Sequence, residues 1–283
     1  MAHRRWNPFP HPASDFDYAG AKLKKGWSRL HRGDREPFPD AAWVEEMASV
    51  AAELTPRVPA AQAASTLQDA WRSYHAGDFG PAVELGLSLG PIGFNVANKA
   101  ANIYATYLET DEKARLALFQ ASAERGARLA KAAPALANAY YFQAQALGRY
   151  SQGISVVKAL AQGLGGRILG ALNDAIAREP KHADAHIALG AYHAEVIAKV
   201  GAMVGSLTYG ASRDAAVENF DAALKLNPDS AIARVEYANA LAMLFGKARM
   251  KQATALYRDA TACIPADAME CLDVELAKSE LES

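Results

Sequence analysis

Two stretches near the carboxyl end of the chain repeat one pattern of small and aromatic residues in front of a proline. In each stretch an alanine, an aromatic residue and a second alanine precede the proline by 12, 8 and 5 residues. These residues are Ala216, Phe220 and Ala223 before Pro228, and Ala253, Tyr257 and Ala260 before Pro265. Spacings of four and three residues place side chains on one stripe of an α-helix, and the residue before a proline avoids the α conformation. The pattern therefore predicts a helix that buries the same face twice and ends near a proline.

A longer period runs through most of the chain. It is marked by Pro91, Pro134, Pro180, Pro228 and Pro265, which are separated by 43, 46, 48 and 37 residues. Small residues stand ten positions after the first four prolines, and bulky residues stand thirteen positions after them. The small residues are Ala101, Ala144, Gly190 and Ala238, and the bulky residues are Tyr104, Leu147, His193 and Leu241. Helix axes approach to about 8–10 Å, closest where the crossing side chains are small, so we expect a series of stacked antiparallel hairpins.

The composition agrees with a fold made only of helices. Alanine and aliphatic residues dominate, while runs of β-branched residues are sparse, which favours helix over sheet. After Asp40, an expected N-cap, Trp43, Met47, Val50 and Leu54 recur at helical spacing. No convincing strand pattern follows, and we therefore predict an all-α fold.

These units resemble the tetratricopeptide repeat (TPR) family, whose unit is a helix-turn-helix of about 34 residues. The best unit joins ADAHIALGAYH (183–193) to AAVENFDAALKLNP (215–228), and the resemblance covers roughly residues 62–265. It implies a right-handed superhelix of antiparallel helical hairpins, a TPR-like α-solenoid. Because the units are longer than those of the family, they resemble the long hairpins of the TRAP-transporter T-component group.

The distribution of charge and proline suggests three parts. Residues 1–39 are expected to form a basic, proline- and aromatic-rich arm, either loose or laid across the domain, since residues 1–35 hold eight Lys or Arg and three Asp or Glu. Residues 40–264 are expected to form the helical repeat domain. Residues 265–283 are expected to form a capping helix that hides the last apolar face of the solenoid.

Candidate binding residues follow from the position of each unit's first helix. In the resembled family one face of these helices lines a concave groove that holds an extended peptide or a partner's helix. Counting from each proline places four residues of each of four units on that face. We take eight of these sixteen residues as binding candidates: Asn95, Asn98, Asn102, Asn138, Tyr141, Gln145, Arg149 and Asn239. Side-chain amides donate and accept together, so they can pair with the main chain of an extended peptide. The alternative is an ordinary solvated helix face with Asn95 as an N-cap.

Two glycine-rich apolar segments lengthen neighbouring hairpins, at residues 148–170 and 195–213. Burial of a Val, Leu or Met side chain is worth about 1.5–3 kcal/mol, which argues against leaving these segments in water. Three arrangements remain open: the segments pack on each other, they cover one end of the groove, or they meet another subunit.

The sequence contains no pattern that predicts catalysis or a bound cofactor. P-loop, GxSxG, HExxH and paired Cys–His motifs are absent from it. His182, His186 and His193 fall near one helical stripe, and packed, hydrogen-bonded histidines explain this spacing better than a metal site does. We therefore predict neither an enzyme nor a bound metal or cofactor.

The overall charge and cysteine content bear on partners and location. The formal net charge of −1 gives no general attraction to nucleic acid. No apolar run reaches the eighteen residues that a membrane-spanning helix needs, so we expect no membrane insertion. Two cysteines without a CxxC pair, and the lack of a secretory signal, suit a reducing cytoplasm.

Together these features predict a non-catalytic scaffold that binds a peptide or partner protein in a concave, amide-rich groove. Two alternatives remain. One is a small-ligand-binding protein in which the glycine-rich segments close over the groove. The other is a homo-oligomeric transporter-accessory protein, as the T-component resemblance implies.

Overall fold

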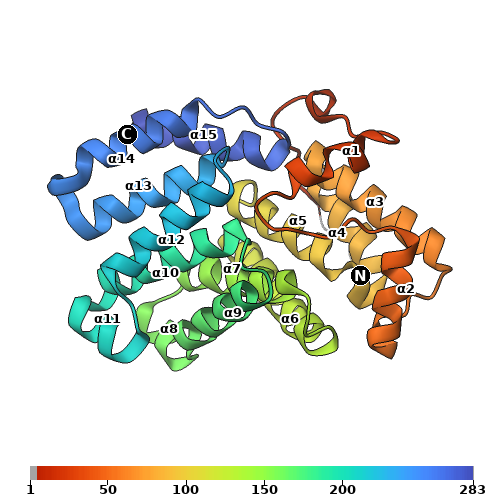
Figure 1. Ribbon diagram of the computed structural model, residues 1–283, viewed down its shortest axis with the longest axis horizontal. Coiled ribbons are helices and arrows are strands. Elements are labelled where there is room, and N and C mark those ends of the chain that lie inside the picture. The colour runs from red at the N-terminus through yellow and green to blue at the C-terminus, as the bar shows by residue number, and fades with distance from the viewer. Residues whose placement is uncertain (1–4, 283) are drawn as a thin grey trace. The chain divides into compact units, whose positions relative to one another are not determined.

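The structure is a computed structural model that describes residues 5–282, and its regular elements are all helices. The first four residues of the expected arm and Ser283 of the expected capping helix lie outside the described residues. The α-helices are α1 (Lys22–Leu30), α2 (Ala41–Val50), α3 (Ala60–Ala76), α4 (Phe79–Ser88), α5 (Phe94–Tyr107), α6 (Glu112–Ala132), α7 (Ala137–Gln152), α8 (Val156–Ala161), α9 (Leu164–Arg178), α10 (Ala183–Val200), α11 (Ala202–Tyr209), α12 (Arg213–Leu226), α13 (Ala231–Phe245), α14 (Met250–Thr261) and α15 (Ala268–Glu282) (Figure 1).

Helix boundaries follow the signals in the sequence. The side chain of Asp40 accepts a hydrogen bond from the Trp43 amide and caps α2, as predicted. Helices α6, α9 and α12 each end two residues before one of the marked prolines, because the residue preceding a proline avoids the α conformation. The prediction of an all-α fold is confirmed for the described residues.

The chain divides into two compact units. The first comprises Met1–Arg29 and Glu36–Gly153, and the second comprises Leu30–Arg35 and Ile154–Ser283. This division falls within the segment that we predicted to be one repeat domain, and the predicted three-part organisation stays a prediction. Each unit is described by itself.

In the first unit, successive helices from α3 to α7 pack against one another, and the backbone of α4 closely approaches the short turn Gly90–Gly93 that precedes α5. The carbonyl oxygen of Gly86 lies only 2.0 Å from the place where a Cβ atom on Gly93 would stand. Of the expected arm, α1 buries Leu23 and Trp27. The Trp27 ring meets that of Trp71 on α3 edge-on, with 5.7 Å between ring centroids. Helix α1 of the arm therefore packs on the helices of this unit, whereas Leu30–Arg35 belong to the second unit.

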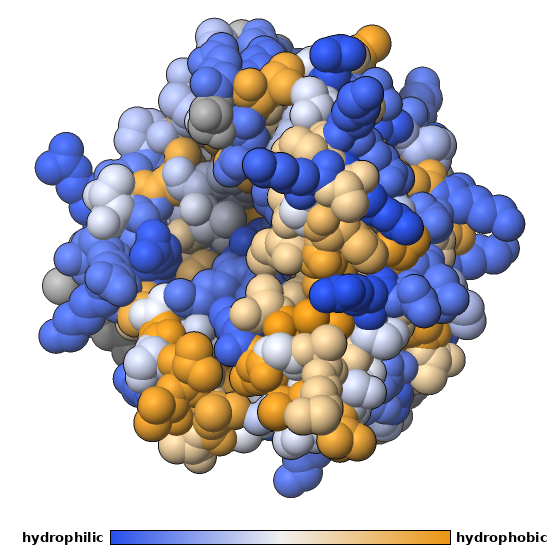
Figure 2. Space-filling view, turned by 90° about the vertical axis from the view of Figure 1, so that its left-hand side faces the viewer, coloured by the Kyte–Doolittle hydropathy of each residue, from blue (hydrophilic) through white to orange (hydrophobic). Residues whose placement is uncertain are grey.

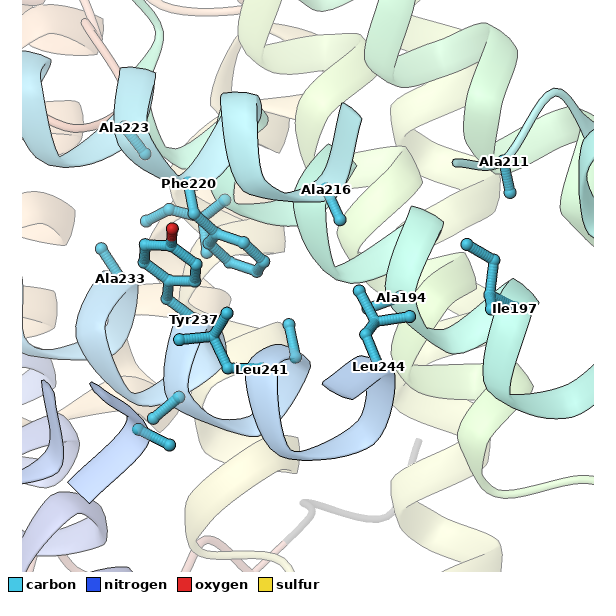
Figure 3. Packing of buried hydrophobic residues seen from close by; sticks show 14 residues of the cluster. Ala194, Ile197, Ala211, Ala216, Phe220, Ala223, Ala233, Tyr237, Leu241 and Leu244 are labelled. Atoms are coloured by element: carbon cyan, nitrogen blue, oxygen red, sulfur yellow. The ribbon is translucent and has the colours of Figure 1, made fainter. Parts of the chain in front are cut away.

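In the second unit, α10 packs against α12 and α13, and α13 packs against α14 and α15. The core of these hairpins contains Phe220 and Tyr237, whose rings stack with 5.0 Å between centroids and 9° between planes (Figure 3). A Cβ atom on Gly190 would come within 2.8 Å of the Phe220 ring, so the absence of a side chain at residue 190 makes room for this aromatic residue.

The four small residues at matched places after the prolines are all buried. Ala101, Ala144 and Ala238 are at most 2% exposed, and Gly190 lies against α12. Their burial agrees with the expectation that small side chains permit close helix packing.

Candidate functional site: an amide cluster around Glu36

Helix α5 carries the three asparagines that we placed on the expected groove. Asn95, Asn98 and Asn102 are spaced by three and four residues and therefore share one face of the helix. Asn95 is 5% exposed and the other two are fully buried. The face is therefore covered in the described structure, and it is not the solvated helix surface that we considered as an alternative.

The carboxylate of Glu36 lies between amides from two helices. The Asn95 Nδ2 atom donates to both carboxylate oxygens, at 3.2 and 3.0 Å, and the Asn138 Nδ2 atom of α7 donates to Oε2 at 2.5 Å. Glu36 itself is buried. A buried carboxylate needs hydrogen-bond donors to replace water, and these two amides supply them.

The main chain beside Glu36 is also held by side chains of this unit. Trp27 donates its Nε1 proton to the Glu36 carbonyl oxygen at 2.7 Å, and Gln68 Nε2 donates to the Pro39 carbonyl oxygen at 3.0 Å. Residues 35–40 have no regular secondary structure, and Pro37 and Pro39 favour extended backbone at the residues that precede them. The amide face thus contacts an irregular, proline-containing segment of its own chain.

The remaining two asparagines of α5 pair with neighbouring helices. Arg125 Nε of α6 donates to Asn98 Oδ1 at 2.7 Å, while Asn102 Nδ2 donates to Gln145 Oε1 at 2.9 Å and to the Phe142 carbonyl at 3.3 Å. Burial lowers the pKa of Arg125 to about 10, so its guanidinium remains charged at neutral pH. These contacts join α5, α6 and α7 into one polar layer.

Each asparagine of α5 also has one side-chain atom without a hydrogen-bond partner among residues 5–282. These atoms are Asn95 Oδ1, Asn98 Nδ2 and Asn102 Oδ1, all of which are buried. A buried polar atom left unpaired costs about 1–3 kcal/mol. The layer therefore retains hydrogen-bonding capacity for water or for a polar ligand group.

A buried lysine adds positive charge to the same helix. Lys99 lies one turn after Asn95, and its ammonium group is 5.2 Å from the ring centroid of Tyr74 and 5.8 Å from that of Trp71. Aromatic faces stabilise such a cation. Because this lysine is positively charged, the amide face is better suited to bind a carboxylate than to bind a cation.

The other predicted residues have separate surroundings. Tyr141 is buried with its ring 5.2 Å from that of Phe142. Arg149, which is partly exposed, donates to Gln152 Oε1 at 3.2 Å. Asn239 belongs to the second unit, where its Oδ1 atom accepts a hydrogen bond from the Tyr257 hydroxyl. The structure therefore gathers Asn95, Asn98, Asn102, Asn138 and Gln145 into one layer and does not add Asn239 to it.

Sequence reasoning did not identify Glu36 as part of the cluster. One available signal was the short motif Glu-Pro-Phe-Pro at residues 36–39, where alternate prolines favour an extended strand-like backbone. A charged residue in such a segment requires a partner once it is buried. The amide-rich stripe was the obvious candidate for that partner.

Three basic residues of the arm form ion pairs within their own unit. Lys22 bonds with Asp17, Lys24 lies 3.9 Å from an Asp40 oxygen, and Arg32 pairs with Asp229. Because these pairs are partly or largely exposed, each contributes little stability. Of these three, only the Arg32–Asp229 pair links the arm to a distant part of the repeat domain.

The three histidines of α10 and its start have individual structural roles. His182 Nδ1 accepts from the Ala185 amide and caps the helix, while His186 Nδ1 lies 2.8 Å from Asn219 Oδ1. His193 is buried, and this burial lowers its pKa below the usual value. Packing and hydrogen bonding thus account for the stripe that the sequence displays.

The lowered pKa of His193 predicts acid sensitivity. Below pH about 6.5 the unfolded chain binds a proton at this residue while the folded protein resists it, so folding stability falls as the pH falls. We expect His193→Leu to lose less of its melting temperature than the wild type does between pH 7.5 and 5.5. Calorimetry at several pH values measures this difference, and identical pH profiles would contradict the assignment.

Comparison with solved structures identifies the type of fold. A thermophilic TPR protein of Thermus thermophilus superposes with a TM-score of 0.54 at 19% sequence identity, covering 77% of this chain and 99% of that chain. The fold is of the tetratricopeptide type. No protein-family model and no curated protein matches the sequence. No helix within residues 5–282 is both long and apolar enough to cross a membrane.

Proposed function

We propose that this TPR-type chain is a non-catalytic scaffold whose amide layer on α5 and α7 binds an extended segment that carries a carboxylate. The observation that supports the proposal is the clasp of Glu36 by Asn95 and Asn138, together with the bonds to the main chain beside it. In the described state the bound segment belongs to the protein itself. A partner segment of the same chemistry would compete with residues 35–40 for the two amides.

The amide layer suits recognition of a peptide with little dependence on its other side chains. Two neutral donors meet the carboxylate, and the Gln68 amide meets a backbone carbonyl. Hydrogen bonds to a charged acceptor are worth about 1.5–3 kcal/mol each, which is enough to make the acidic residue decisive. We therefore expect the partner segment to be extended, to contain Glu or Asp, and to tolerate proline beside it.

A peptide added in trans tests this proposal. The probe is a fluorescent peptide with the sequence of residues 33–41, GDREPFPDA, and the full-length protein is the receptor. The Glu36→Ala variant removes the protein's own carboxylate from the two amides. We expect this variant to bind the probe at least tenfold more tightly than the wild type does, as measured by fluorescence anisotropy. Adding Asn95→Ala and Asn138→Ala to Glu36→Ala should remove this gain.

Matched controls separate recognition from general destabilisation. Glu45 on α2 and Asn173 on α9 are exposed, so Glu45→Ala and Asn173→Ala should leave probe affinity unchanged. A probe with Gln in place of its Glu should bind the Glu36→Ala protein more weakly. Equal affinities for the wild type and Glu36→Ala would contradict the proposal.

From the resemblance to TPR proteins we infer only that the chain is a protein-binding scaffold. The comparisons do not point to the T-component group, and the proposal does not rest on a transport role. Cys263 and Cys271 are not joined in a disulfide. They fit the cytoplasmic location that we propose for the protein.

A further inference from the structure

The ends of two hairpins in the second unit carry exposed apolar side chains, which we call the apolar tips. They belong to the short helices α8 and α11, which appear at the lower left of Figure 1. The side chains are Val156, Val157 and Leu160 on α8, and Met203, Val204 and Leu207 on α11. Three of them, at residues 157, 203 and 207, are 76%, 75% and 83% exposed. Figure 2 shows a hydrophobic surface in the lower part of this side of the molecule.

The apolar tips lie at the same end of the unit because α8 leads into α9 and the start of α9 contacts the end of α11. Helix α8 leads into α9 through Gly163, and a Cβ atom on Gly165 at the start of α9 would lie 3.1 Å from the ring of Tyr209. Tyr209 is the last residue of α11, and its carbonyl oxygen accepts a hydrogen bond from the Tyr192 hydroxyl of α10. The two exposed apolar helices therefore lie at the same end of the unit.

Exposure of this surface to water is costly. Full burial of each Val, Leu or Met side chain would contribute about 1.5–3 kcal/mol. Scattered apolar residues are normal on protein surfaces, whereas several gathered in adjacent segments indicate an interaction surface. Of the three arrangements that the sequence left open for these segments, mutual burial is not what the structure shows. Both short helices keep their large apolar side chains exposed.

The charged residues within the segments that form the apolar tips are basic, while Asp174, Glu195 and Asp214 stand just outside these segments. Residues 151–173 include Lys158 and Arg167 and no acidic residue, and residues 196–213 include Lys199 and Arg213 and no acidic residue. Lys158 and Arg167 are exposed. Lys199 pairs with Glu195 one turn before it, a contact worth only about 0.3–0.5 kcal/mol. The complementary surface is therefore apolar in its interior and anionic at its rim.

A second copy of the chain fits this description poorly, because a symmetric contact through the same tips would bring like charges together. A lipid bilayer with anionic headgroups fits it well. Its apolar interior lies beneath a negatively charged surface, and it needs no hollow shaped to receive the side chains. Helices of six and eight residues are far too short to span the roughly 30 Å hydrocarbon core, but they can enter the interface.

We propose that the apolar tips dock the protein on the surface of an anionic lipid membrane. Val157, Met203 and Leu207 enter the boundary between headgroups and acyl chains, and the Lys158 and Arg167 side chains contact lipid phosphates. This docking is peripheral and leaves every helix of the described structure folded as it is. It does not involve the amide layer, and it places the proposed scaffold at a membrane surface.

Vesicle cosedimentation with the full-length protein tests the proposal. One set of vesicles contains phosphatidylcholine with one quarter phosphatidylglycerol, and the other contains phosphatidylcholine alone. We expect the wild type to sediment with the anionic vesicles and to bind the neutral ones at least tenfold more weakly. A variant that combines Val157→Ser, Met203→Ser and Leu207→Ser should lose at least tenfold in partitioning to anionic vesicles. Lys158→Glu with Arg167→Glu should also weaken binding.

Two variants provide matched controls. Ile264, which follows α14, is 85% exposed but lies outside the apolar tips, so Ile264→Ser should bind like the wild type. Lys251 on α14 is likewise exposed, and Lys251→Glu should have little effect. All variants change exposed positions, and unchanged circular dichroism melts verify that each is folded.

Three results would overturn the proposal. The first is a wild type that binds neither kind of vesicle. The second is an equal loss of binding in Ile264→Ser and in the triple serine variant. The third is a wild-type dimer in light scattering that the triple serine variant converts to a monomer, since the tips would then be a contact between two copies.

Discussion

Replacing Phe220 by alanine is expected to lower the free energy of unfolding by about 3–5 kcal/mol. The ring is fully buried, it stacks on Tyr237, and it fills the space that Gly190 leaves open on α10. Removal of the ring creates a cavity where three helices meet, and the rigid crossing of α10 and α12 cannot collapse into it. Urea denaturation followed by circular dichroism measures the loss.

A substitution at the protein surface serves as the control for this prediction. Leu207→Ala also truncates a large apolar side chain in the second unit, but Leu207 is largely exposed, so the free energy of unfolding should change by no more than about 0.5 kcal/mol. If Phe220→Ala cost less than about 1 kcal/mol, the stacked aromatic pair would not be the centre of the repeat packing.

Gly93→Ala is expected to lower the free energy of unfolding by about 3 kcal/mol, at the upper end of the usual cost of overpacking. The added methyl group would stand 2.0 Å from the carbonyl oxygen of Gly86. Because the obstacle is backbone and not a flexible side chain, α4 and the turn before α5 must move apart to admit the methyl group. The same denaturation experiment measures the effect.

Gly170→Ala is the matched control for this second prediction. Gly170 lies within α9, and nothing stands within 4 Å of the place where its Cβ atom would be. Alanine has the higher helix propensity, so this change should raise the free energy of unfolding by up to about 1 kcal/mol. Similar effects at the two glycines would contradict the close backbone contact between α4 and the turn before α5.

The fold could be predicted from the sequence because its determinants are local or recur at fixed spacing. The Ala–aromatic–Ala pattern around Phe220 requires one buried helical stripe, and each marked proline limits the helix before it. The capping role of Asp40 was likewise visible from the residues that follow it. Such signals need no knowledge of which helices meet in space.

The candidate site was predictable only in part. Helical periodicity correctly indicates that Asn95, Asn98 and Asn102 share one face, but it cannot say what covers that face. The covering residue, Glu36, is 59 positions before Asn95 and 102 positions before Asn138. Its placement depends on tertiary contacts such as the Trp27–Trp71 packing, which no periodic pattern encodes. The assignment of these asparagines to a partner therefore remains a prediction.

The clasp of Glu36 has a consequence for the order of events during synthesis. A ribosome that adds about 5–20 residues per second needs several seconds to proceed from Glu36 to Asn138, a separation of 102 residues. Both residues pass through the same exit tunnel, so the acidic segment emerges this long before its second amide donor does. The nascent chain thus has a period in which residues 35–40 are available to other molecules, and that period ends when α7 emerges.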